Sequence, residues 1–102
     1  MANRYEDKVA SVSKALTIME LLSKDPQGMG LVEISNQAGM NKTTVYRLLT
    51  SLMEKEYVEQ DEKSGKYSLG LKILSVASAL YEKMDIRAVV RKHAQELLNG
   101  FP

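Results

Sequence analysis

One segment of the chain concentrates side chains that can bind a polyanion. From Ile34 to Met53 there is no Asp or Glu, although the chain has 13 acidic residues. This segment contains the run GMNKTTVYRLLTSL, which supplies several hydroxyl groups together with Lys42 and Arg47. Hydroxyl, ammonium and guanidinium groups contact the phosphates and base edges of DNA, where a nearby carboxylate would be repelled. The run is therefore a candidate DNA-contacting segment.

The same run has the periodicity of an amphipathic helix. At about 100° per residue, one side of the helix is apolar and consists of Val45, Leu48, Leu49 and Leu52. An outward arginine can pair with guanine O6 and N7, and a threonine methyl can contact a thymine methyl. Hydroxyls and backbone N–H groups in the first turn can hold phosphates. The predicted DNA-contacting residues are Asn41, Lys42, Thr43, Thr44, Tyr46, Arg47 and Thr50.

Two alternatives apply to this helix. Its outer face can be an ordinary solvated surface, although such surfaces usually mix Glu with Lys. Tyr46 lies about 100° from the apolar centre, so its ring can face either DNA or the core.

Two further helices are expected to position this one. Apolar residues recur at helical spacing over residues 11–24, and their number predicts a well-buried first helix. A short second helix is expected over residues 32–38. Gly39 then suits a positive φ at its end, and Asn41 suits the N-cap of the third helix, which runs to about Lys55. Two helices joined by so short a turn form a helix-turn-helix. Met29, Met40 and Met53 are expected to fill the core.

A β-hairpin is expected next. YVEQD at residues 57–61 and KYSL at 66–69 have strand composition, and Gly65 suits the positive φ of the loop EKSG. A hairpin directly after a helix-turn-helix is a wing. Lys63, Ser64 and Lys66 can reach the DNA backbone. The alternative is that the lysines only protect an edge strand from aggregation, and the nearby acids Glu59, Asp61 and Glu62 favour it.

The helix expected over residues 71–84 carries two apolar stripes, which predicts one face on its own domain and one on a second copy. The predicted homodimer interface comprises Leu71, Ile73, Leu74, Ala77, Leu80, Tyr81 and Met84. Asp85 can cap a last helix over residues 86–99. His93 falls in the apolar stripe of that helix and is expected to be a packing residue.

Composition excludes several classes of protein. The 102 residues suit one small domain, and the net charge of +1 gives no general preference for nucleic acid. There is no cysteine, and no carboxylate pair beside the one histidine, so we expect neither an enzyme nor a metal or cofactor site. The N-terminus lacks the apolar core of a signal peptide, and no apolar run approaches a membrane span. We expect a cytoplasmic protein without membrane partners.

Three stretches, VSKALTIMELL, EISNQAGMNKTTVYRLLTSLMEKEYVEQD and KYSLGLKILSVASAL, resemble the N-terminal domain of the IclR family of bacterial transcription regulators. The resemblance covers residues 12–98. It implies a mainly helical winged helix-turn-helix, with a three-helix core and a two-stranded wing, that dimerises and binds a palindromic operator. It also implies that Lys42, Thr43, Thr44, Tyr46 and Arg47 face DNA, that the wing touches the backbone, and that residues 71–84 form a linker helix that contributes to dimerisation.

The resemblance also implies a division of the chain, and the chain departs from the family at two residues and in its shorter length. The expected parts are a polar arm (1–10), the winged helix-turn-helix (11–69), the linker helix (70–85) and the start of a truncated effector-binding domain (86–102). Val32 stands where relatives often cap the second helix with Ser or Thr, and Ser35 replaces a common alanine. A small-molecule effector is expected only for a full-length member. The alternatives to operator binding are a protein-interaction module or a truncated dimerisation partner.

Overall fold

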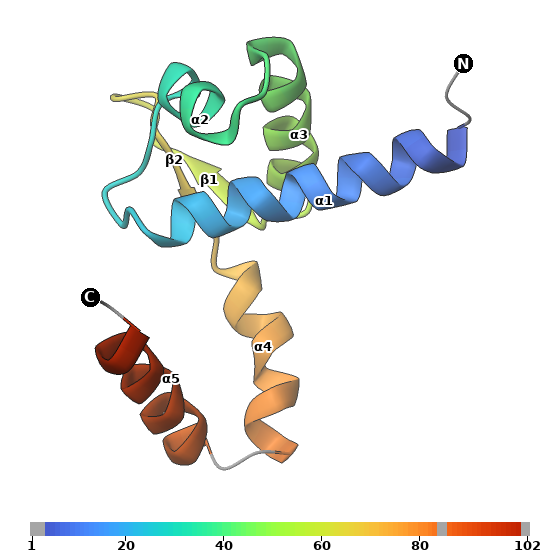
Figure 1. The fold of residues 1–102 in the computed structure, drawn as a ribbon. Coiled ribbons are helices and arrows are strands. Elements are labelled where there is room, and N and C mark those ends of the chain that lie inside the picture. Colours follow the sequence, from blue (N-terminus) through green and yellow to red (C-terminus); the bar gives the residue numbers. More distant parts are fainter. Residues whose placement is uncertain (1–3, 84–85, 101–102) are drawn as a thin grey trace.

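The computed structural model describes residues 4–83 and 86–100 of the chain. The elements in chain order are α1 (Arg4–Ser23), α2 (Leu31–Ala38), α3 (Lys42–Glu54), β1 (Val58–Gln60), β2 (Tyr67–Leu69), α4 (Lys72–Lys83) and α5 (Ile86–Gly100). Figure 1 shows α1, α2 and α3 with the hairpin in one body, from which α4 leads away. The expected mainly helical fold, with three core helices and a two-stranded wing, is confirmed.

The core lies where the three helices meet the hairpin. Its buried side chains are Ile18, Leu22, Met29, Ile34, Val45, Leu49, Val58 and Tyr67. Burying one such aliphatic side chain contributes roughly 1.5–3 kcal/mol. Met40 and Met53 pack against this cluster, so the expectation that the three methionines fill the core is confirmed.

The wing is tied to the segment between α1 and α2. Strands β1 and β2 pair antiparallel, with Val58 opposite Leu69 and Gln60 opposite Tyr67. Met29 forms an additional antiparallel bridge with Tyr67, in which each backbone N–H donates to the other residue's carbonyl at 2.8 Å. This bridge was not predicted, because the glycines and proline around Met29 indicated only a loop. It fixes the base of the wing against the helical core.

Helix α1 differs from the expectation in two ways. It begins at Arg4, so the polar arm expected over residues 1–10 is helical from that residue onward, and residues 1–3 lie outside the described part. The helix is not well buried along its length, because Val12 and Leu16 are 61% and 52% exposed while Ile18 and Leu22 are buried. In Figure 1 the N-terminal end of α1 extends past α3, beyond the helical core.

Helix α4 does not pack one face on its own domain, which corrects the expectation. None of its residues is buried; Ile73 and Ala77 are half-buried, and the other described members of the predicted interface are exposed. Met84 lies outside the described residues. His93 on α5 is exposed, so its expected packing role is also wrong for the single chain. Among the described helices, none has the length and apolarity that a membrane span requires.

Candidate nucleic-acid interface

The turn between α2 and α3 sets the direction of α3. Gly39 ends α2 with a φ of 67°, as predicted, and its N–H donates to the Ser35 carbonyl. Asn41 is the N-cap of α3, also as predicted, and its Oδ1 accepts a hydrogen bond from the Thr44 N–H at 2.8 Å. A glycine tolerates the left-handed region at little cost, and an asparagine cap satisfies a donor that the helix leaves unpaired.

Ser35 fixes the same turn from inside. It is only 7% exposed, and its hydroxyl donates to the Met40 carbonyl. The Met40 N–H in turn donates to the Ser35 carbonyl at 3.1 Å. The sequence showed Ser35 only as the replacement of a common alanine, and its hydrogen bond to the turn was not predicted. The expected cap position at Val32 is wrong: the N-cap of α2 is Gly30, no side chain caps the helix, and Val32 lies in its first turn.

The outer face of α3 presents the predicted residues to solvent. Lys42, Thr43, Tyr46, Arg47 and Thr50 are exposed, as is Asn41 before them, and Thr44 is half-buried. The Thr50 hydroxyl donates to the Tyr46 carbonyl at 2.8 Å. Its proton is thereby engaged, so Thr50 can offer a base an oxygen acceptor and a methyl group.

Tyr46 points away from the core. Tyr46 is 56% exposed, so of the two orientations that the sequence left open, burial in the core is excluded. It also lies near the buried Tyr67 of the wing. Burial raises the pKa of Tyr67, and the neighbouring Tyr46 phenol raises it further, because two phenolates so placed would repel each other.

The wing tip is built by Asp61. Its carboxylate accepts from the Ser64 N–H at 2.7 Å and its carbonyl accepts from the Gly65 N–H at 2.8 Å. Gly65 has a φ of 76°, as predicted. Hydrogen bonds from Ser64 lower the pKa of Asp61, so this carboxylate is charged at neutral pH. Asp61, one of the three acids that favoured a purely protective hairpin, is therefore a structural part of the turn.

The structure separates the two wing lysines. Lys63 lies in a shallow depression beside Glu59, Asp61 and Glu62. Lys66 lies on the α2 side, in a depression that it shares with Gly30, Leu31, Val32, Glu33, Asn36 and Gln37. The Ser64 hydroxyl accepts from the Lys66 N–H at 3.2 Å. The wing residues are thus in solvent but do not form one cationic patch with each other.

A groove between α1 and α3 was missed from the sequence. Its walls are Ala10, Ser11 and Lys14 of α1, and Thr44, Tyr46, Arg47, Leu48, Thr50 and Ser51 of α3. It contains two cations, five hydroxyl-bearing residues and no acid. Helical spacing in the sequence could have indicated it. Lys14 lies four residues before the buried Ile18 and therefore on the same face of α1.

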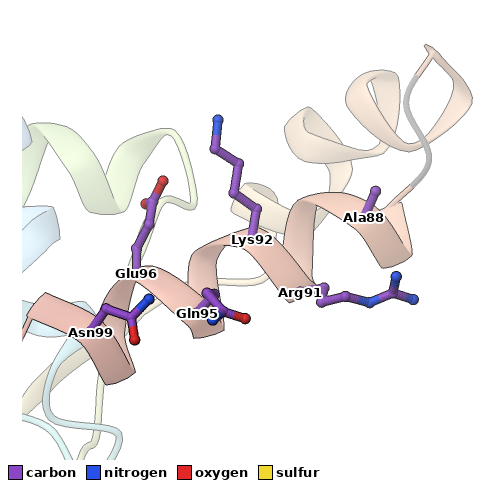
Figure 2. Close-up of a pocket in the computed structure, with 6 residues that line it drawn as sticks. All are labelled: Ala88, Arg91, Lys92, Gln95, Glu96 and Asn99. Atoms are coloured by element: carbon purple, nitrogen blue, oxygen red, sulfur yellow. The ribbon is translucent and has the colours of Figure 1, made fainter.

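Another depression lies on α5 alone. Figure 2 shows its lining residues, Ala88, Arg91, Lys92, Gln95, Glu96 and Asn99, all projecting from this one helix. Arg91 and Lys92 point in different directions rather than toward a common centre. Ligand sites are concave and place a few polar groups around one point. The depression is therefore the polar surface of a helix and offers no enclosed site.

Comparison with known protein families identifies the family of this chain. Residues 11–62, from within α1 to the wing tip, match the model of the IclR helix-turn-helix domain. The chain belongs to the IclR family. The resemblance seen in the sequence is thereby confirmed.

Relatives of this IclR-family chain are transcriptional regulators and not enzymes. It is 33% identical to the HTH-type transcriptional regulator KdgR of Dickeya chrysanthemi, over 82% of this chain and 27% of that protein. It is 33% identical to the DNA-binding transcriptional repressor YiaJ of Escherichia coli, over 95% of this chain and 35% of that protein. The chain thus spans about a third of these curated relatives.

Solved structures agree with the family fold. A putative IclR transcriptional regulator from Silicibacter sp. TM1040 superimposes with a TM-score of 0.70 at 36% identity, covering 80% of this chain and 32% of that chain.

Proposed function

We propose that this IclR-family chain binds double-stranded DNA in a sequence-specific manner and acts as a transcriptional regulator. The observation that carries the proposal is the outer face of α3, where the exposed Thr43, Arg47 and Thr50 stand in a stretch without acids. A helix of this kind enters the major groove with its N-terminal residues toward the bases. YiaJ, named a DNA-binding repressor, supports the same activity and a repressing role.

The contacts divide between bases and backbone. Thr43, Arg47 and Thr50 reach base edges, while Lys42, Thr44 and the first-turn N–H groups of α3 hold phosphates. Tyr46, which is exposed, contacts the backbone through its ring or hydroxyl. The wing residues Lys63, Ser64 and Lys66 add backbone contacts beyond the groove.

The chain acts as a homodimer through α4. Leu74, Leu80 and Tyr81 of α4 are 58%, 58% and 48% exposed, and Leu71 directly before the helix is 72% exposed. This segment therefore carries an apolar surface that its own domain does not cover. Exposed apolar patches of this kind mark interaction sites. A two-fold dimer binds a palindromic operator whose half-sites are about 34 Å, or a multiple of that, apart.

The remaining expectations concern the longer regulator. Because the chain spans about a third of its relatives, a small-molecule effector belongs to the rest of a full-length member. A transcriptional regulator works where the chromosome is, which for a bacterium is the cytoplasm. The rival function is a winged-helix interaction module or a truncated dimerisation partner without operator binding. The outer face of α3 exposes no large aliphatic side chain, and Tyr46 is its one exposed large hydrophobic residue, which favours DNA over a protein partner for α3.

A gel shift tests the proposal. A duplex is first selected from random sequences with the parent chain, and binding is then measured at about 50 and 200 mM salt. DNA binding predicts tight binding that weakens steeply with salt. No binding of duplex at the lower salt would leave only the rival function.

A matched pair of variants shows which surface binds. Thr43→Glu places a carboxylate on the proposed DNA face, whereas Thr17→Glu places one on an exposed position of α1. We expect the first to lose binding and the second to keep it. Equal loss in both would indicate that binding does not involve the α3 face.

A further inference from the structure

We propose that Lys14 of α1 holds a backbone phosphate of the DNA strand beside α3, so that the DNA-binding surface includes the groove between α1 and α3. This inference rests on the proposed DNA binding by α3. It adds a contact from a helix that lies outside the helix-turn-helix pair and the wing.

The first support is the position of Lys14 in α1. Residues 14, 18 and 22 are spaced four apart and follow one face of the helix. Ile18 and Leu22 on that face are buried in the core. The same face continues toward the N-terminus with Lys14, Ser11 and Ala10, beyond the edge of the core. The α1 face that packs on the core therefore brings a cation, Lys14, into the groove beside α3.

The second support is what the groove contains. Lys14 faces a wall that includes Arg47, Thr44 and Ser51, and Ser11 lies on its own wall. Two cations and several hydroxyls share this groove, and no carboxylate lines it. Like charges placed together without an acid between them repel each other, and a bound anion removes that cost. An ammonium group and hydroxyls are the usual donors to a phosphate.

The third support is the place of the groove relative to the bases. Arg47 and Thr50, proposed to reach base edges, also line it. A strand whose bases meet α3 carries its phosphates beside that helix, and α1 passes beside α3 (Figure 1). The occupant is therefore the DNA backbone rather than a free anion, which would need an enclosed site.

The test is the salt dependence of duplex binding for Lys14→Ala. Each phosphate contact contributes about 0.9 to the slope of log K against log salt, or a factor of roughly 3.5 between 50 and 200 mM. We expect the slope of the variant to fall by about 0.9, with weaker binding at low salt. Lys14→Arg retains the charge and is expected to retain the slope. Lys24→Ala removes a lysine that follows α1 and does not line the groove, and it serves as the matched control.

The outcomes separate the two proposals. If the parent binds duplex and Lys14→Ala keeps the slope of Lys24→Ala, the phosphate contact is wrong while DNA binding by α3 stands. If the parent binds no duplex, both are wrong. Amide chemical shifts of Ser11 and Lys14 distinguish the source of the phosphate. These chemical shifts are expected to change when duplex is added but not when inorganic phosphate is added at matched ionic strength. A change with inorganic phosphate alone would overturn the assignment to the DNA backbone.

Discussion

The Oδ1 atom of Asn41 accepts a hydrogen bond from the backbone N–H of Thr44 at 2.8 Å, and this contact marks the start of α3. Asn41→Ala removes the cap and leaves that N–H to solvent. We expect the free energy of unfolding to fall by about 1 kcal/mol. Urea denaturation followed by circular dichroism measures it.

Asn41→Asp is the matched variant. Aspartate caps a helix as well as asparagine does and suits the positive end of the helix dipole. Its charge, however, would face the phosphates. We expect stability to be kept and duplex affinity to fall. An aspartate variant that binds DNA as tightly as the parent would show that the first turn of α3 does not approach the backbone.

Arg47 is expected to set base preference. Arg47→Ala should cost roughly 1–3 kcal/mol of operator binding and relax the preference at one position, if the guanidinium pairs with guanine. Arg47→Lys keeps the charge but lacks the planar fork, so it should keep the salt slope and lose base discrimination. Binding to the selected operator and to single-base variants measures both. Unchanged operator affinity in Arg47→Ala would exclude α3 as the recognition helix.

Lys63 is expected to contribute to duplex affinity whatever the base sequence of the DNA. Lys63→Ala should weaken binding to all duplexes alike and lower the salt slope by about 0.9. Its neighbours Glu59 and Glu62 reduce the local positive potential, so the loss should be smaller than that for Arg47. Lys55→Ala, at the opposite end of α3 from its first turn, is the control. A loss confined to one operator sequence would contradict a backbone contact.

Local patterns were enough to predict most of the helix-turn-helix. The apolar residues of α3, the positive φ at Gly39 and the cap at Asn41 are each determined by a few neighbouring residues, and all three are confirmed. The wing turn at Gly65 is local in the same way. The outward position of Tyr46 required the structure, because its place on the helix flank was compatible with either side.

Features that depend on distant packing were missed. The bridge between Met29 and Tyr67 joins residues far apart in sequence, and no periodicity signals it. The need for glycine at position 70, directly after β2, is clear only from the structure. A Cβ at Gly70 would overlap the Glu56 carbonyl, and the Gly70 N–H donates to the Tyr57 carbonyl at 2.8 Å. The extent of α1 was underestimated because its first turns are polar and gave no apolar period.

Leu80 is expected to lie in the dimer interface that we propose for α4. It is 58% exposed in the single chain, and the helix has no buried residue of its own. Leu80→Asp would place a charge in that interface, where the cost of desolvating an unpaired carboxylate opposes association. We expect the parent to sediment as a dimer and the variant as a monomer in analytical ultracentrifugation. Ser75→Asp puts the same charge on a position of α4 about 140° away around the helix and should leave the dimer intact. A Leu80→Asp chain that remains dimeric would mean that the copies associate elsewhere, and the exposed Val12 and Leu16 of α1 would then be the next surface to substitute.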